Sequence, residues 1–209
     1  MEFNEKQKFI LHTAEKLFAC KGFDGTSIRD IAEAAHVNIA MISYYFGSKD
    51  KLMQALFYER TAEVTLRLES LLNDSSLDTW QKMSVIVDEY VERVWQRQTF
   101  FKIMMNEQLL QKNEVINEMI TVMKKQNMDL MDQIIREGQR KKLFKRHFDS
   151  ILVSNTIMGT AWQTFLNKES YRKYHHLEEE DDIKFLADLK DKTRKHIKTV
   201  IKEILRYEA

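Results

Sequence analysis

The chain has 209 residues, of which 44% are hydrophobic and 31% are charged, a composition typical of a folded globular protein. Its formal net charge is +1, so no strongly basic field points to nucleic acid as a partner of the whole molecule. The only cysteine, Cys20, excludes an intramolecular disulfide. The stretch MEFNEKQK lacks the apolar core of a signal peptide, and no apolar run is long enough to span a membrane. We expect a cytoplasmic protein without a membrane partner.

The sequence contains no proline and only five glycines, three of which (Gly22, Gly25 and Gly47) lie in the first fifty residues. Long helices exclude proline from their interiors, and the abundant Leu, Met, Lys, Glu and Gln are good helix formers. We therefore predict an all-α protein. Short helices with tight turns should come first, followed by longer helices with few breaks.

A first helix is expected to end at Lys21-Gly22. The apolar residues that recur at helical spacing before this stop are Phe9, Ile10, Ala14, Leu17 and Phe18. A second helix of about ten residues should begin at Thr26 or Ser27, where Ser27 and Asp30 have the spacing of a capping box. Its inward stripe consists of Ile28, Ile31, Ala32 and Ala35.

The second helix should break at Ala35-His36-Val37, and Asn38 is suited to cap a third helix that runs to about Phe46. Two short helices joined by such a turn predict a helix-turn-helix unit. The third helix keeps an apolar outer face, which requires a partner. Periodicity alone leaves three readings of that face open: DNA, a protein contact or simple tolerance. The outer residues are Ile39, Ala40, Met41, Ser43 and Tyr44.

The stretch from Thr26 to Leu52, TSIRDIAEAAHVNIAMISYYFGSKDKL, resembles the DNA-binding domain of the TetR family of bacterial repressors. The resemblance covers roughly residues 8 to 55 and rests on a specific combination of spaced positions. They are Thr26, Ile31-Ala32, Ala35, Val37, Tyr44-Tyr45-Phe46 and Ser48-Lys49-x-x-Leu52, preceded by the run from Ala14 to Phe23. The resemblance implies a helix-turn-helix DNA-binding domain in residues 1–47 and a larger helical ligand-binding and dimerisation domain in residues 48–209.

Position by position, the resemblance implies that Thr26 and Ser27 contact phosphate through hydroxyl and backbone N–H groups. It places Arg29 where its side chain reaches a guanine edge. The recognition helix contributes Asn38, Ile39, Ala40, Met41 and Ser43, and the DNA backbone is contacted by Tyr44, Tyr45 and Lys49.

The sequence departs from the family pattern at several of these positions. His36 stands where glycine is common in the turn, and histidine tolerates the left-handed conformation better than most residues. Ala40 replaces a frequent glycine, Ser43 a frequent tyrosine and Tyr45 a common histidine. Ile39, Ala40 and Met41 cannot make bidentate hydrogen bonds, so we hypothesise that they contact thymine methyl groups. Arg29 is then the main polar reader of sequence.

The remaining residues predict long helices without a flexible linker. A fourth helix should run from Ser48 to about Leu72, followed by a loop at residues 73–76. Further helices are expected at residues 78–97, 99–111, 114–142, 149–168 and 182–207. The polar segment from Lys168 to Leu177 is predicted to be mobile.

The last two helices both carry an apolar face. A terminal amphipathic helix can pack against its own domain, but the resemblance favours a homodimer in which these helices pair with their copies in a four-helix bundle. Two-fold symmetry would then present the recognition helices about 34–36 Å apart or somewhat more, to match a palindromic operator. The predicted interface consists of Ile151, Met158, Phe165, Ile197, Val200, Ile201 and Ile204.

Methionine and aromatic residues are frequent between residues 100 and 131. Such stripes form protein cores or, because methionine is adaptable, ligand pockets. The resemblance implies an inducer held among these helices. We expect a mainly apolar pocket formed by Phe101, Met104, Met105, Met123 and Trp162. Gly159, in mid-helix, costs about 1 kcal/mol relative to alanine and allows close approach of a ligand or a helix.

No nucleophile with its base, metal cluster or glycine-rich phosphate loop suggests an enzyme, a metal or another cofactor. The adjacent His175 and His176 have poor metal-ligand spacing. We expect a transcriptional regulator, a repressor released from double-stranded operator DNA by an unknown small-molecule inducer. The alternative is a helical dimeric small-molecule-binding module whose DNA-binding head no longer functions. The apolar recognition helix and the near-neutral head keep this alternative open, because the first fifty residues of the chain hold six Lys and Arg against seven Asp and Glu.

Overall fold

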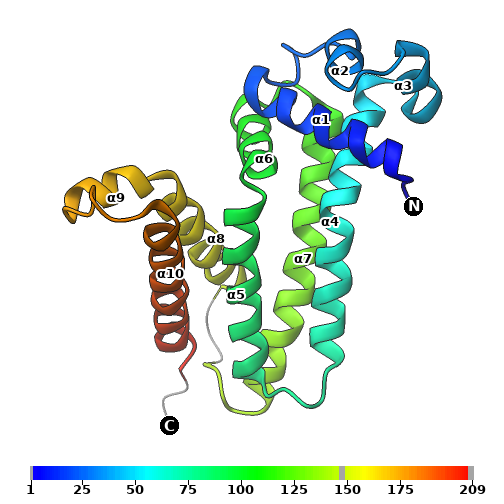
Figure 1. The fold of residues 1–209 in the computed structure, drawn as a ribbon. Helices are drawn as coiled ribbons and strands as arrows, with labels where there is room; N and C mark the ends of the chain where they lie inside the picture. Colours follow the sequence, from blue (N-terminus) through cyan, green and yellow to red (C-terminus); the bar gives the residue numbers. More distant parts are fainter. Residues whose placement is uncertain (1, 146–148, 207–209) are drawn as a thin grey trace. The chain divides into compact units, whose positions relative to one another are not determined.

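The computed structural model describes residues 2–145 and 149–206, and these form ten helices and no strand (Figure 1). The first four helices are α1 (Glu5–Lys21), α2 (Ile28–Ala34), α3 (Ile39–Phe46) and α4 (Lys49–Asn73). They are followed by α5 (Thr79–Gln96), α6 (Gln98–Leu110), α7 (Glu114–Arg140), α8 (Ser150–Leu166), α9 (Lys168–Tyr174) and α10 (Asp182–Leu205). The all-α prediction is confirmed.

The helices pack as two compact units. Unit 1 consists of Met1–Leu66 and Gln98–Gln126, and unit 2 of Arg67–Arg97 and Asn127–Ala209. The helices α4 and α7 therefore each belong to both units. The core of unit 1 includes Ile10, Leu11 and Phe18 of α1, Ile31 of α2, Ile42 and Phe46 of α3, Leu52 and Leu56 of α4, Phe100 and Ile103 of α6, and Ile116 and Ile120 of α7.

The turn between α2 and α3 has the hydrogen bonds of a Schellman motif. The amide of Val37 donates to the Ala32 carbonyl at 3.0 Å, and the amide of His36 donates to Glu33 at 3.1 Å. His36 has a φ of 52°, so the expected left-handed conformation of this residue is confirmed. Asn38 then begins α3, because its side chain accepts a hydrogen bond from the amide of Ala40 at 2.9 Å.

A buried ion pair joins three helices of unit 1. Glu15 on α1 is only 3% exposed, although its neighbours on this inward face are apolar. Arg60 on α4 donates from Nε and Nη2 to Glu15 Oε2 at 2.9 and 2.5 Å. Thr99 on α6 donates its hydroxyl to the other carboxylate oxygen at 2.5 Å. This arrangement lets a buried carboxylate stay hydrogen-bonded at both oxygens.

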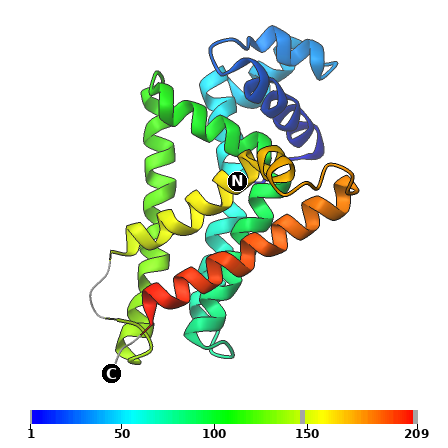
Figure 2. The same cartoon turned by 90° about the vertical axis from the view of Figure 1, so that its left-hand side faces the viewer.

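Unit 2 brings together α5, α8 and α10, which Figure 2 shows from the side of α10. Ion pairs cross from α5 to α10: Glu92 bonds with Lys190 at 3.1 Å and with Arg194, and Asp88 with Lys198 at 2.6 Å. Desolvation opposes ionisation of Glu92, but the bonds from the two cations outweigh it and lower the pKa of this carboxyl. These ion pairs join α5 and α10 at the edges of their contact, and the interior of that contact is apolar.

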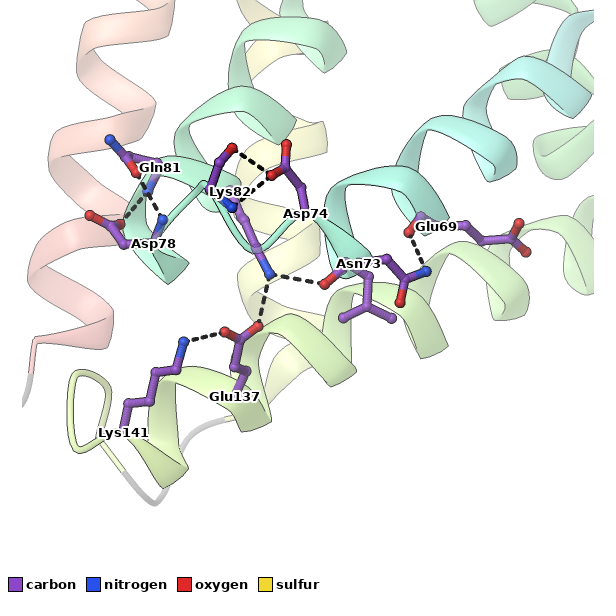
Figure 3. A network of polar contacts seen from close by, with 10 residues as sticks. Glu69, Asn73, Asp74, Asp78, Gln81, Lys82, Glu137 and Lys141 are labelled. Carbon is purple, nitrogen blue, oxygen red and sulfur yellow. Dashed lines mark hydrogen bonds and ion pairs between the residues drawn. The ribbon is translucent and has the colours of Figure 1, made fainter.

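A buried lysine of α5 bonds the C-terminal end of α4 (Figure 3). Lys82 on α5 has only 4% of its side chain exposed, and its ammonium donates to the Leu72 carbonyl at 2.9 Å and to Glu137 on α7 at 3.2 Å. Glu137 also accepts from Lys141 at 2.5 Å. The Lys141 bond, with a smaller contribution from Lys82, lowers the pKa of Glu137 against the effect of burial. The carbonyls that α4 leaves unpaired at its end are thus partly satisfied from α5.

The segment predicted to be mobile contains the helix α9, which the sequence analysis did not predict. Arg172 organises the chain that follows this helix: its guanidinium donates to the carbonyls of Leu177 at 2.9 Å and Glu178 at 3.1 Å, and it also bonds Glu180 and Asp182. It lies over the Phe185 ring at 5.1 Å. No residue of α9 is buried. Because α9 has no buried face, apolar periodicity gave no signal for this helix. Its arginine instead bonds the chain that follows.

We expect Arg60→Met to lower the free energy of unfolding by about 3–5 kcal/mol, because it leaves the buried Glu15 carboxylate without its cation. The matched control is Arg67→Met on the same helix. Arg67 pairs with Glu89 at 2.6 Å but is 48% exposed, so its loss should cost less than about 1 kcal/mol. Urea unfolding of both variants tests this, and equal losses would contradict the assigned role of Arg60.

We expect His36→Gly to raise the free energy of unfolding by up to about 1 kcal/mol, because glycine adopts the left-handed conformation without steric strain. The control is Glu33→Gly, an exposed position inside α2, which should instead lose about 1 kcal/mol. Thermal unfolding of the two variants should shift in opposite directions. A loss of stability in His36→Gly would show that the imidazole makes a contribution larger than the strain.

Candidate nucleic-acid interface

The outer face of α3 is exposed and largely apolar. Ile39 is 40% exposed and Tyr44 is 84% exposed, and Ala40 and Ser43 also face solvent. Met41 is half-buried. The opposite face is occupied by Ile42 and Phe46, which are buried. Solvent thus meets the aliphatic side chains of Ile39 and Ala40, the hydroxyl of Ser43 and the phenol ring of Tyr44.

Tyr44 and Tyr45 differ in how far they project from the unit. The Tyr45 ring lies 5.6 Å from that of Tyr44 and 6.2 Å from that of Phe46, and Tyr45 packs against the core of unit 1. Tyr44 has little cover. Of the two predicted backbone-contacting tyrosines, Tyr44 offers most of its ring and its hydroxyl, and Tyr45 offers only part of its side chain.

The first turn of α2 presents Arg29. Ser27 caps this helix in the predicted capping box: its hydroxyl accepts from the Asp30 amide at 3.1 Å, and Asp30 Oδ2 accepts from the Ser27 amide at 2.7 Å. Hydrogen bonds from Ser27 lower the pKa of Asp30. Arg29 is exposed, and no carboxylate among the described residues lies within ion-pair distance of it. Its guanidinium can therefore bond an external acceptor.

The predicted phosphate contact through the Thr26 hydroxyl does not fit the structure. Thr26 is 1% exposed, its hydroxyl donates to the Gly22 carbonyl at 2.9 Å, and its amide donates to Phe23 at 3.2 Å. The Ser27 hydroxyl also has an internal acceptor, because it donates to Asp30 at 2.5 Å. Both side chains shape the loop before α2, and their donors are already bonded there.

Lys49 was expected to contact the DNA backbone, but the structure directs its ammonium into unit 1. Nζ donates to the carbonyls of Phe23 at 3.0 Å and Thr26 at 3.1 Å, and it lies 4.2 Å from the centre of the Phe23 ring. These acceptors are more than twenty residues away in sequence. The lysine therefore binds the loop between α1 and α2.

Glu107 on α6 is a charged residue that the sequence analysis missed. It is 6% exposed; burial raises its pKa, and the nearby Asp24 carboxylate raises it further. A signal was present, because Glu107 continues the inward stripe of Phe100, Ile103 and Met104 at helical spacing. The same holds for Glu15, which lies between Leu11 and Phe18 on the inward face of α1.

The residues predicted to line a ligand pocket are divided between the units. Phe101 and Met123 pack against the core of unit 1, to which Met104 belongs, and Met105 is 37% exposed. Trp162 lies in unit 2, where its ring stacks on Phe165 at 5.8 Å. The structure therefore does not bring the predicted set together within one compact unit.

The predicted dimer residues differ in accessibility. Phe165, Ile197 and Ile201 are at most 7% exposed within this one chain, because α10 packs against α5 and α8. They offer no surface to a second copy, and the expectation for these three is corrected. Ile151 is 49% exposed, whereas Met158, Val200 and Ile204 are half-buried.

Within residues 2–145 and 149–206, no group of three or more His, Cys, Asp and Glu side chains could hold a metal ion. Over the same described residues, every helix is too short or too polar to cross a membrane.

Comparison with known proteins agrees with this architecture. Residues 10–56 match the family model of bacterial regulatory proteins of the tetR family, and residues 80–201 match that of the tetracyclin repressor-like C-terminal domain. The Probable HTH-type transcriptional regulator YttP of Bacillus subtilis (strain 168) is 28% identical over 180 residues, which are 84% of this chain and 86% of YttP. The HTH-type transcriptional repressor NicS of Pseudomonas putida is 30% identical over 158 residues, 73% of this chain and 70% of NicS.

Among solved structures, the transcriptional regulator FadR from Bacillus subtilis in complex with stearoyl-CoA superimposes with a TM-score of 0.66 at 20% identity, covering 91% of this chain and 96% of that one. The second family model alone matches more than half of the chain. This chain therefore belongs to the TetR family of bacterial regulatory proteins and is a helix-turn-helix transcriptional regulator.

Proposed function

We propose that the protein is a repressor that binds a palindromic operator as a homodimer and is released by a small, mainly apolar ligand. Residues 1–47 would contact DNA, and residues 48–209 would dimerise and bind the ligand. The observation that carries the proposal is the exposed apolar face of α3, held at its start by the Asn38 cap. A helix with such a face needs a partner, and the major groove admits one helix.

Sequence would be read by apolar contacts on α3 and by one arginine on α2. Ile39 and Ala40 are exposed and match the methyl group of thymine, which is the apolar feature of the major groove. Met41, half-buried, would contribute from the edge of this surface. Arg29 would donate to guanine, and Asn38 would contribute its side-chain N–H₂.

The DNA backbone would be contacted by Ser43 and Tyr44, with Tyr45 contributing at the edge. Contacts of this kind fix register and orientation but carry no sequence information directly. The first fifty residues hold six Lys and Arg against seven Asp and Glu. Affinity would therefore depend on a few placed donors and on the dimer, which doubles each contact, and not on a general positive field.

The dimer would form along an exposed stripe of α8. The stripe alternates spacings of four and three residues, as in helices that pair side by side. It consists of the exposed residues Leu152, Gly159, Gln163 and Leu166 and the half-buried Thr156. Leu152 and Leu166 are 63% and 52% exposed. Apart from the backbone of α8 itself, no atom of the described residues lies within 4 Å of the place where a Gly159 side chain would begin. This glycine would let the partner helix approach closely.

The ligand would bind to apolar and aromatic side chains with at least one hydrogen bond. In unit 2 the Trp95 ring packs on Phe165 at 5.4 Å, and Phe165 packs on Trp162. Trp95 Nε1 is buried and has no hydrogen-bond partner among the described residues, which is an unfavourable state for a donor. An acceptor on the ligand would satisfy it. The complex of FadR with stearoyl-CoA makes long-chain acyl compounds the first to add to a DNA-binding assay.

Release would follow from a difference in ligand affinity between two arrangements of the protein. A coupling of about 1–3 kcal/mol changes operator affinity roughly 5- to 150-fold, which is enough for a genetic switch. The rival function is a helical small-molecule-binding module whose head no longer binds DNA. It is favoured by the near-neutral head and by the inward direction of the Thr26 and Lys49 donors.

The proposal is tested by selecting bound fragments of the protein's own genome at two salt concentrations. We expect a short palindrome with thymines near the centre of each half-site, and binding that weakens with salt because phosphate contacts release counterions. An operator without such thymines would contradict the reading by Ile39 and Ala40. No enrichment by a folded dimer, with or without acyl ligands, would support the rival function.

The same selection with Arg29→Ala identifies the polar reader. We expect a loss of about 1–3 kcal/mol on the selected operator and a relaxed preference at one base pair of each half-site. Binding to random DNA should change little, because the exposed arginine is assigned to a base and not to phosphate. Equal losses on the operator and on random DNA would contradict this role.

We expect Gly159→Leu to convert the dimer to a monomer at micromolar concentration, because the added side chain occupies the space of the partner helix. The fold should be retained, since Gly159 is exposed and a Cβ added there meets no other described residue within 4 Å beyond the helix's own backbone. Sedimentation measures the oligomeric state, and circular dichroism with thermal unfolding verifies the fold. A variant that remains fully dimeric would remove α8 from the interface.

A further inference from the structure

The loop between α1 and α2 depends on one side chain from α4. Lys49 donates from Nζ to the carbonyls of Phe23 and Thr26 at 3.0 and 3.1 Å, and its charge lies 4.2 Å from the centre of the Phe23 ring. Phe23 and Thr26 are 7% and 1% exposed. A buried carbonyl gains most from a charged donor, so this lysine is a main constraint on the path of the loop.

Of the two bonds, the one to the Thr26 carbonyl bears directly on the residues that follow. The carbonyl of Thr26 and the amide of Ser27 belong to the same peptide group. Lys49 holds the oxygen of that peptide at 3.1 Å, and Asp30 accepts from its N–H at 2.7 Å. A planar group held at both ends cannot rotate, and this group leads directly into α2. Lys49 therefore constrains the peptide group from which α2, with its exposed Arg29, begins.

Lys49 has few alternatives to this position. Two carboxylates lie in the neighbourhood of Lys49. They belong to Glu107 on α6, which is 6% exposed, and to Asp24 in the loop itself. Neither lies within ion-pair distance of Lys49 in the part of the chain described by the structure. Its partners are thus the two carbonyls and the aromatic face, and two of its three donors are engaged without DNA.

We propose that Lys49 is a positioning residue for DNA recognition: by fixing the Thr26–Ser27 peptide it sets the direction from which α2 presents Arg29, and it does not bond phosphate. This inference rests on the base-reading role proposed for Arg29. A reading side chain must be held to within about 0.5 Å of its productive position. A small rotation of the peptide before α2 is therefore enough to misplace a guanidinium at the end of a long side chain.

The test compares Lys49→Met, Arg29→Ala and the double variant on the selected operator and on random DNA, at several salt concentrations and well below each unfolding temperature. Methionine keeps an apolar stem over Phe23 but has no donor. The control is Lys51→Met, which removes the same charge from an exposed position two residues away. If Lys49→Met does not fold, Lys49→Gln replaces it, because its NH₂ group can still donate to a carbonyl but carries no charge.

We expect Lys49→Met to weaken operator binding about tenfold, within the range expected for loss of one bidentate base contact. Binding to random DNA should change less than about twofold, and the slope of log K against log salt should stay the same. The double variant should bind the operator about as tightly as Arg29→Ala alone. Because Lys49 acts through Arg29, its loss has no further effect on affinity once the arginine is absent.

Four results would overturn the inference, each for a different reason. Equal losses on both DNAs with a slope reduced by about 0.9 would show a phosphate contact. A lower unfolding temperature with full operator affinity would show a role in stability alone. Full loss of preference in Arg29→Ala with additive effects in the double variant would separate Lys49 from the arginine. An Arg29→Ala variant that keeps its preference would instead refute the reading role, and with it the positional inference.

Discussion

The buried carboxylate of Glu15 is the constraint on which the arrangement of unit 1 depends. Arg60 on α4 and Thr99 on α6 both bond it, so a charge on α1 is stable in the interior only when these two helices lie beside it. The apolar core follows the same geometry, since Phe57 of α4 and Phe100 of α6 pack at 4.9 Å. Helix α1 thus packs against α6, although α6 begins about fifty residues after α3 ends.

The compact units therefore divide the chain at other places than the predicted domains do. The sequence suggested a head of residues 1–47, whereas the compact units change within α4, at Arg97 and within α7. The backbone leaves the helical conformation at Arg97, with φ −115° and ψ 39°, and two of the three crossings are continuous helices. For the proposed response to a ligand, a displacement of α4, α6 or α7 would reach the head through elements already in its core.

The helices could be predicted from sequence because their signals are local. Apolar spacing, the Ser27–Asp30 box and the Asn38 cap each involve residues within a few positions of one another, and the outer face of α3 follows from the same periodicity. The directions of Thr26 and Lys49 could not be predicted in this way. The Lys49 ammonium and its acceptors are 23 and 26 residues apart in sequence. The residues next to a lysine in the sequence do not show whether its side chain points to solvent or inward. The helix α9 was missed for a related reason, since the bonds of Arg172 to main-chain carbonyls leave no pattern of residue types.

The dimer prediction shows a further limit of periodicity. An apolar stripe indicates that a face is covered but not what covers it, and Ile197 and Ile201 on α10 are covered by their own unit. The exposed stripe of α8 mixes leucine with threonine, glycine and glutamine, so it is less apolar than the buried face of the same helix. A surface that must remain soluble before assembly has this composition. Interfaces of this kind are recognised by exposure in the folded chain together with regular spacing, and sequence supplies only the second of these.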